Sequence, residues 1–258
     1  MKIGITGCAG RVGQILIEEI HKGTDAGIEL AGGTVLTEDL DKYANVGYFV
    51  TDDPDELFQK SDAVIDFTTP DATRKHIALA AKHKVTFVIA TTGLTAADEQ
   101  NIKEASKDTP VVYSANYSVA VNMLEALVEK TAKTLGNDFD IEIVEAHHKH
   151  KIDAPSGTAL MLGKAAAKAK DIDFEKHAVL SREGETGARK DNEIGFSTIR
   201  GSDVVGEHTV YFLGEGERLE LKQQATNRAL YAKGAIRAAI WATKQNPGLY
   251  SMRDVLDL

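Results

Sequence analysis

The sequence is poor in the residues that stabilise secreted proteins and anchor membrane proteins. Cys8 is the only cysteine among 258 residues, so the chain cannot form an internal disulfide, which is typical of a reducing compartment. It contains no run of about 18 apolar residues, and its first residues lead directly into a predicted strand, without the apolar core of a signal peptide. We therefore expect a cytoplasmic protein with no membrane partner.

Positive charge is also scarce. The 30 Lys and Arg residues are outnumbered by 39 Asp and Glu residues, which gives a formal net charge of −9. An acidic chain repels the phosphate backbone, so the composition argues against a nucleic-acid partner. The length suffices for one large or two modest domains that bury most of their apolar surface.

Strands and helices alternate in the first half of the chain. Apolar runs predict strands at 2–6, 28–35, 63–66, 86–90 and 111–114, and helical spacing predicts helices at 54–60, 71–82 and 96–107. This alternation is typical of a Rossmann-type, doubly wound parallel sheet in an α/β fold. Ligands of such sheets bind beyond the carboxyl ends of the strands.

The pattern changes near residue 119. Helices are predicted at 121–135, 158–169 and 228–246, and strands at 141–144, 177–181, 195–199, 207–213 and 218–224. We expect a second, α+β domain built on a mostly antiparallel sheet, and a last helix that returns to the first domain. The predicted division is residues 1–118 plus 228–258 for dinucleotide binding, and residues 119–227 for substrate binding and oligomerisation. The segment 182–193, rich in Gly and charge, is expected to be flexible.

A glycine motif follows the first strand and precedes an amphipathic helix. Gly7, Gly10 and Gly13 allow a tight turn, a close approach of backbone to a pyrophosphate, and close packing of helix on strand. The alternative is an ordinary glycine-bearing turn, but the position after the first strand favours dinucleotide binding. Cys8, inside this turn, is interpreted as a small turn residue.

Two further loops lie at the carboxyl ends of predicted strands. Thr91, Thr92 and Gly93 follow a buried strand, where they either bind a nicotinamide carboxamide or cap the next helix. Asn116 to Ser118 are open to the same two interpretations. The second strand ends without the acid or base that selects between NADH and NADPH, since Glu38 and Asp39 come one turn late, so both cofactors remain open.

The most informative segment runs from Glu145 to Thr158. Three histidines and two lysines precede a Pro-Ser-Gly-Thr turn and a predicted helix start, which brings cations and backbone N–H donors to one place. Because the segment joins an apolar strand to an apolar helix, we favour an anion site with proton donors over a solvated charged face. No metal is expected, because adjacent histidines of an extended segment point to opposite faces and no ligand set is complete.

These residues resemble the 4-hydroxy-tetrahydrodipicolinate reductase family, also called dihydrodipicolinate reductases. The resemblance spans nearly the whole chain and is most specific between Glu145 and Ala159; it extends to Asp66–Thr68, Ser181–Gly184, Gly206–Thr209 and the last seven residues. It implies a homotetrameric enzyme of lysine and diaminopimelate synthesis that reduces a small cyclic dicarboxylate with NADH or NADPH. Lys149, where many members have Arg, and the missing acid after the second strand depart from the pattern.

The resemblance also implies roles for individual residues. His147 matches the proton donor and Lys151 the second catalytic cation. The implied substrate-binding residues are His148, Ser156, Gly157, Thr158 and Thr92. The implied cofactor-binding residues are Gly7, Cys8, Ala9, Gly10, Arg11, Val12, Ala90, Thr91, Thr92, Ser114, Ala115, Asn116 and Tyr117.

Two other functions compete with this interpretation. A protein that senses a dinucleotide without reducing anything would not need the proton donors beside the anion site. A phosphorylating semialdehyde dehydrogenase would need a nucleophilic cysteine at the substrate site, and Cys8 lies in the glycine turn instead.

Overall fold

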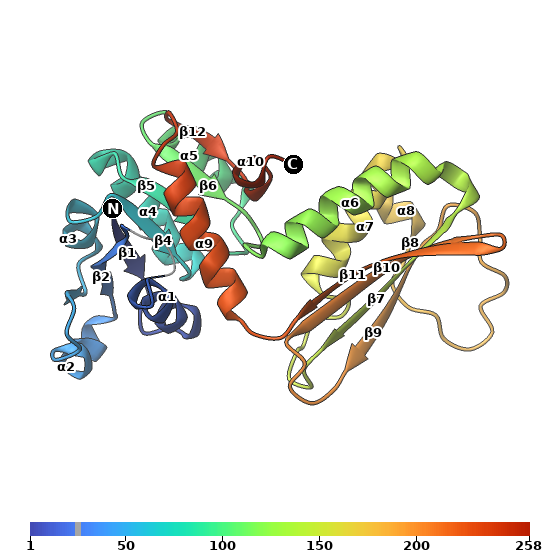
Figure 1. Ribbon diagram of the computed structural model, residues 1–258, viewed down its shortest axis with the longest axis horizontal. Coiled ribbons are helices and arrows are strands. Elements are labelled where there is room, and N and C mark those ends of the chain that lie inside the picture. The colour runs from blue at the N-terminus through green and yellow to red at the C-terminus, as the bar shows by residue number, and fades with distance from the viewer. Residues whose placement is uncertain (24–26) are drawn as a thin grey trace. The chain divides into compact units, whose positions relative to one another are not determined.

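The structure is a computed structural model that describes residues 1–23 and 27–258. The chain forms two compact units, one of residues 1–119 with 228–258 and one of residues 120–227 (Figure 1). The first boundary lies one residue beyond the expected division between 118 and 119, and the second lies between 227 and 228. Among the described residues, no helix combines the length and apolar character that crossing a bilayer requires.

The first unit contains a seven-stranded sheet in which every pairing is parallel. Its strand order is β12-β6-β5-β4-β1-β2-β3. The strands are β1 (Lys2–Thr6), β2 (Glu29–Thr34), β3 (Val50–Thr51), β4 (Ala63–Asp66), β5 (Thr86–Ile89), β6 (Pro110–Tyr113) and β12 (Gly248–Tyr250). All residues of β4 and β5 are buried, as expected for central strands covered on both faces.

Helices cover both faces of this sheet, which confirms the doubly wound Rossmann-type fold. One core joins β1 to α1 (Arg11–His21), α9 (Ala229–Ala242) and α10 (Met252–Leu256), and a second lies under α3 (Pro54–Gln59), α4 (Pro70–His83) and α5 (Ala96–Ala105). The short η1 (Thr37–Asp39) and α2 (Leu40–Tyr43) follow β2. Helix α9 packs on α1 and on the central strands (Figure 1), so the last helix does return to the first unit, as predicted.

The second unit contains a five-stranded sheet of order β11-β10-β7-β9-β8. Its strands are β7 (Asp140–His147), β8 (Ala178–Val179), β9 (Ile194–Arg200), β10 (Gly206–Gly214) and β11 (Glu217–Ala225). Its helices are α6 (Val119–Leu135), α7 (Gly157–Ala169) and α8 (Phe174–His177), with a short η2 (Gly136–Asp138). Helices α6 and α7 lie on one face of the sheet (Figure 1), over a core that includes Leu124, Leu162 and Phe196.

This sheet is mixed, where the sequence analysis expected a mostly antiparallel one. Strand β10 is antiparallel to β7 and β11, but β9 is parallel to β7 and β8. The connection from β7 to β9 contains helix α7, and parallel neighbours require such a crossover. The predicted helix at 158–169 was therefore the feature that indicated parallel pairing.

Candidate functional site

The glycine loop at the end of β1 has the geometry of a close-packed turn into a helix. Gly7 has φ +69°, and a Cβ there would lie 2.8 Å from Cγ2 of Thr68. A Cβ on Gly13 would lie 2.5 Å from the carbonyl oxygen of Gly7 and 2.8 Å from Cα of Cys8, so only glycine allows α1 to pack this closely. Gly10 is the exposed N-cap of α1 and has no side chain that would cap the helix. The first N–H groups of α1 have no acceptor within the helix, and this arrangement fits a pyrophosphate.

The side chain of Cys8 takes no part in this surface. It is fully buried against Gly33, and burial raises the pKa of its thiol to about 11. Its backbone N–H donates to the carbonyl oxygen of Thr34 at 3.0 Å. Cys8 is therefore a packing residue of the turn, and the chemistry of a reactive thiolate is suppressed.

The other predicted loops of the first unit lie along the same sheet edge. They follow β4, β5 and β6, which are consecutive neighbours of β1. The N–H of Thr68 donates to Oγ1 of Thr91 at 3.2 Å, which joins the loops after β4 and β5. Thr91 is buried, whereas Thr92 and Gly93 are exposed. The sequence-predicted cofactor residues of this unit are therefore brought together along one edge.

Tyr117 has a role that the sequence analysis missed. Its side chain is 1% exposed, and its hydroxyl lies 2.9 Å from the carbonyl oxygens of both Ile89 and Val112. It thus ties β5 to β6 from within the core, and only its backbone can face a ligand. Asn116 accepts a hydrogen bond from the N–H of Ser118 at 2.8 Å, which shapes the start of α6.

The end of β2 offers no fixed group for the adenosine ribose. Thr34 is already used, because its hydroxyl accepts a hydrogen bond from the N–H of Gly7 at 3.1 Å. Leu36 follows it and is 66% exposed. Asp39 pairs with Lys42 at 2.6 Å, and Glu38 is exposed. This geometry does not decide between NADH and NADPH.

In the second unit, the cationic segment is organised around the carboxylate of Glu145. This side chain is 1% exposed, and Arg200 donates to it through two nitrogens at 2.8 and 2.7 Å. Nδ1 of His147 lies 2.6 Å from its Oε2, and the N–H of Ser156 donates to its Oε1 at 3.1 Å. Burial raises the pKa of Glu145, but the hydrogen bonds from Arg200 and His147 outweigh burial and hold this pKa below its usual value. Glu145 is therefore an ionised acceptor.

His147 is placed by its neighbours on both sides of the ring. It stands at the end of β7, and its Nε2 would lie 3.0 Å from a Cβ on Gly206, so glycine at that position leaves room for the imidazole. Burial lowers the pKa of His147, the Glu145 carboxylate raises it, and the net result is a pKa below the ordinary 6.5. The ring of His208 packs edge-on against it, with centroids 5.2 Å apart.

Ser156 forms the N-cap of α7 and links that helix to the histidines. Its hydroxyl accepts a hydrogen bond from the N–H of Ala159 at 3.1 Å and lies 3.0 Å from Nε2 of His208. Gly157 and Thr158 form the first residues of α7. The positive end of the helix dipole and the first N–H groups therefore lie beside His147, as an anion site requires.

Lys151 acts electrostatically on the cluster formed by Glu145, His147, Ser156 and His208, whereas the ring of His148 lies beside a different residue. The ammonium of Lys151 lies 2.8 Å from Asp153, and its charge acts on the pKa of both His147 and His208. The ring of His148 lies beside His150 instead, and its buried Nδ1 has no hydrogen-bond partner within the described residues. The structure thus gathers His147, Lys151 and Ser156. His148 joins them through its backbone, because its carbonyl oxygen accepts a hydrogen bond from the N–H of Lys151 at 3.1 Å.

Three residues of this site were assigned no role from the sequence: Glu145, Arg200 and His208. Glu145 is the third residue of an alternating row that begins with Ile141 and Ile143, so its inward position was readable from the strand pattern. The other two depend on which strands pair with β7, which sequence spacing alone does not give.

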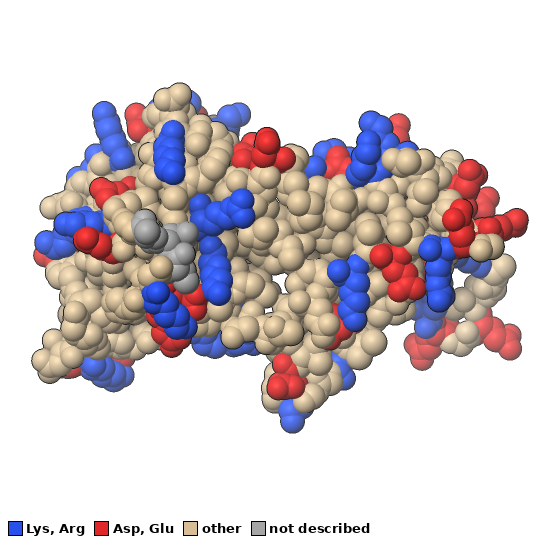
Figure 2. Space-filling view, viewed as in Figure 1, with Lys and Arg blue, Asp and Glu red and all other residues tan. Residues whose placement is uncertain are grey.

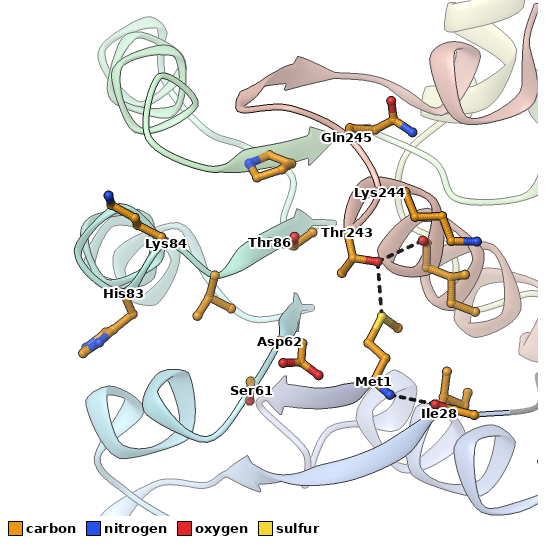
Figure 3. Close-up of a pocket in the computed structure, with 14 residues that line it drawn as sticks. Met1, Ile28, Ser61, Asp62, His83, Lys84, Thr86, Thr243, Lys244 and Gln245 are labelled. Carbon is orange, nitrogen blue, oxygen red and sulfur yellow. Dashed lines mark hydrogen bonds between the residues drawn. The ribbon is translucent and has the colours of Figure 1, made fainter.

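Two other possible sites do not qualify. Among residues 1–23 and 27–258, no group of three or more His, Cys, Asp or Glu side chains is arranged to hold a metal ion. A hollow of about 870 Å³ opens in the first unit between Met1, Asp62, Thr86 and Lys244 (Figure 3). It lies where β1, β4 and β5 begin, and ligands of parallel sheets bind at the opposite, carboxyl edge.

On the face drawn in Figure 2, acidic and basic side chains are interspersed.

Comparison with known proteins covers both units. Residues 1–117 match the family model described as "Dihydrodipicolinate reductase, N-terminus", and residues 120–256 match "Dihydrodipicolinate reductase, C-terminus". The chain is 48% identical to the 4-hydroxy-tetrahydrodipicolinate reductase of Magnetococcus marinus, over 99% of this chain and 98% of that protein. It is 47% identical to the enzyme of the same name from Pseudomonas fluorescens, over 100% of this chain and 99% of that protein.

A solved structure agrees with this result. Dipicolinate-bound dihydrodipicolinate reductase from Paenisporosarcina sp. TG-14 superposes with a TM-score of 0.77 over 97% of each chain, at 24% sequence identity. That likeness shows the same fold. The two family models and the full-length relatives establish that the chain belongs to the dihydrodipicolinate reductase family, a family of oxidoreductases.

Proposed function

We propose that this protein reduces 4-hydroxy-tetrahydrodipicolinate to tetrahydrodipicolinate with NADH or NADPH, in lysine and diaminopimelate synthesis. The observation that supports this most is the cluster of His147, Lys151 and Ser156 at the start of α7, in which the buried Glu145 bonds to His147 and to Ser156. We further propose a cytoplasmic homotetramer, in keeping with the family resemblance.

The substrate carries two carboxylates, and the second unit offers matching partners. The ammonium of Lys151 and the amino end of α7 attract negative charge, and Ser156 to Thr158 supply polar atoms at that end. Lys151 is paired with the exposed Asp153, so a substrate carboxylate would share or replace that partner. A related structure that holds dipicolinate, itself a small dicarboxylate, supports this class of substrate.

His147 supplies the proton in this proposal. Its Nδ1 faces Glu145, which leaves Nε2 on the far side of the ring for the substrate. The resting pKa of His147 lies below 6.5, and a bound dianion would raise it, because nearby negative charge favours the imidazolium. His147 thus gains its transferable proton when the site is filled.

The cofactor would be held by the first unit. The backbone of residues 7–12 and the loops at 90–92 and 114–117 fit a dinucleotide, as argued from the contacts of Gly13 and Gly7. A bound reduced nicotinamide would supply hydride to the conjugated, imine-containing ring, while the 4-hydroxyl group of the substrate leaves as water with the accompanying proton. The proposal also assigns Thr92 to the substrate and nicotinamide.

The test is a coupled assay in which the authentic substrate is offered with NADH and, in parallel, with NADPH. Oxidation of either cofactor only when substrate is present supports the proposal, and binding without oxidation would indicate a dinucleotide sensor. His147→Gln should lower kcat by about 100-fold with a modest change in KM, because a general acid contributes mainly in the transition state. A variant with wild-type turnover would remove His147 from the role of proton donor.

A further inference from the structure

One transverse row of the second sheet is polar where the row before it on the same face is apolar. Glu145 of β7 lies in register with Thr198 of β9 and His208 of β10, and His208 lies opposite Gln223 of β11. Two residues along, the same strands place Phe196, Ile143, Val210 and Leu221 in register. Residues two apart on a strand share a face, so the polar row lies on the same face as this hydrophobic row and is followed there by the pair His147 and Arg200.

Glu145 is the acidic member of this row, and its burial lowers the stability of the fold. A buried carboxylate loses its hydration, and replacing a buried ion pair with apolar groups of similar size is often neutral or stabilising. Ile141 and Ile143 fill the two preceding inward positions of β7, so an apolar residue would suit the strand at position 145. The fold by itself therefore does not call for a carboxylate here.

The hydrogen bonds of Glu145 reach both parts of the site. Its Oε2 forms a hydrogen bond with Nδ1 of His147. Its Oε1 accepts a hydrogen bond from the N–H of Ser156, which is the N-cap of α7. Arg200 donates to both oxygens and also to the carbonyl oxygen of Asp153. Thr198 adds a weaker hydrogen bond to Oε1 at 3.3 Å.

We propose that Glu145, held in place by Arg200, is a positioning residue that fixes the proton of His147 on Nδ1 at rest and aligns the histidine with the anion site at the start of α7. This inference rests on the proposed function, in which Nε2 of His147 serves the substrate. A single carboxylate then sets the distance between the proton donor and the groups that hold the substrate carboxylates.

The charges around His147 single out Glu145 among its neighbours. Lys151 and Arg200 are cations that disfavour a second positive charge on the imidazole, and His208 of β10 packs against the ring as a neutral group. Glu145 is the group that favours the imidazolium. Removing its charge while keeping its shape should therefore make His147 harder to protonate.

The decisive variant is Glu145→Gln, with Thr198→Val as the matched control, because Thr198 donates a hydrogen bond to the same carboxylate and has none to His147 among the described residues. Histidine-selective NMR would follow the titration of His147, assigned among the eight histidines with His147→Asn. We expect the pKa of His147 to fall by about one pH unit or more in Glu145→Gln, as for loss of an adjacent opposite charge. We expect kcat to fall by about 100-fold and KM for NADH to change little, since Glu145 lies in the other unit.

Thr198→Val should change kcat by less than about threefold, since it removes one long hydrogen bond. An unchanged titration of His147 in Glu145→Gln, or an equal loss in both variants, would overturn the proposal. If Glu145→Gln fails to fold, Arg200→Lys is measured in its place, because it keeps a cation but loses the bidentate contact that orients the carboxylate. A wild-type titration of His147 and a wild-type kcat in Arg200→Lys would count against the proposal. The titration does not depend on turnover, so an inactive wild-type enzyme would refute the proposed function alone.

Discussion

His208 should make the second unit sensitive to mild acid. The side chain is 4% exposed, and burial together with the charge at His147 lowers its pKa from 6.5 to about 4. The folded protein therefore binds a proton on His208 only below about pH 4, whereas the unfolded chain binds one below about pH 6.5. Between these values the unfolded state binds more protons, so the free energy of unfolding decreases as the pH falls.

The size of this effect follows from the two pKa values. By about pH 5 the unfolded chain is almost fully protonated at His208 and the folded protein is not, which corresponds to about 2 kcal/mol lost relative to about pH 7.5. The full difference, reached near pH 4, is about 3 kcal/mol. The charges of Glu145 and Lys151 also act on the pKa of His208, and the lowered pKa of Glu145 keeps that carboxylate ionised over the upper part of this range.

The assay compares wild-type protein with His208→Gln, which cannot titrate. The single tryptophan, Trp241, lies in the first unit, so its fluorescence does not report this site. Hydrogen exchange of β10 peptides does, and slow amides there should exchange about 30-fold faster relative to the variant when the pH falls from about 7.5 to 5, after correction for intrinsic rates. If wild type and variant keep a constant ratio, His208 is not a buried neutral histidine.

Two glycine substitutions test the packing of the two ligand sites. Gly206→Ala places a methyl group about 3.0 Å from Nε2 of His147, so kcat should fall. The control Gly201→Ala, whose Cβ would have no atom within 4 Å, should leave kcat unchanged. Equal activities of the two variants would contradict the assigned position of the imidazole. Gly13→Ala meets only backbone of Gly7 and Cys8, so thermal unfolding should show a loss of about 2 kcal/mol and calorimetry a weaker affinity for NADH. Gly10→Ala, whose Cβ would meet a single backbone oxygen at 3.2 Å, should destabilise less, and the opposite order would refute the packing argument.

The fold of the first unit could be predicted from the sequence because its information is local. The strands are continuous apolar runs, the helices have caps such as Thr95 with Asp98, and Gly7 to Gly13 mark the first turn. The elements that escaped prediction are short, such as β3, β12 and α10. Runs of two to five residues carry too little periodicity to be distinguished from loops.

Only the contiguous part of the candidate site in the second unit could be predicted from the sequence. Its cationic segment is contiguous, so His147, Lys151 and Ser156 could be identified from order along the chain. The residues that orient them come from β9 and β10, with Arg200 and His208 55 and 52 residues from their partners Glu145 and Ser156. Such contacts depend on strand pairing and register, and the same lack of register information led to the expectation of a mostly antiparallel sheet.

The charges of this site balance before substrate arrives. Arg200 is paired with Glu145 and Lys151 with Asp153, while burial favours the neutral forms of His147 and His208. A fold that kept an unpaired buried imidazolium at rest would lose stability, because buried charge without a partner is costly. In the proposed function, the dianionic substrate itself supplies the missing negative charge, so His147 becomes an acid in the complex that needs one. Glu145 must then remain ionised throughout, and the two-pronged contact from Arg200 explains how a carboxylate buried this deeply does so.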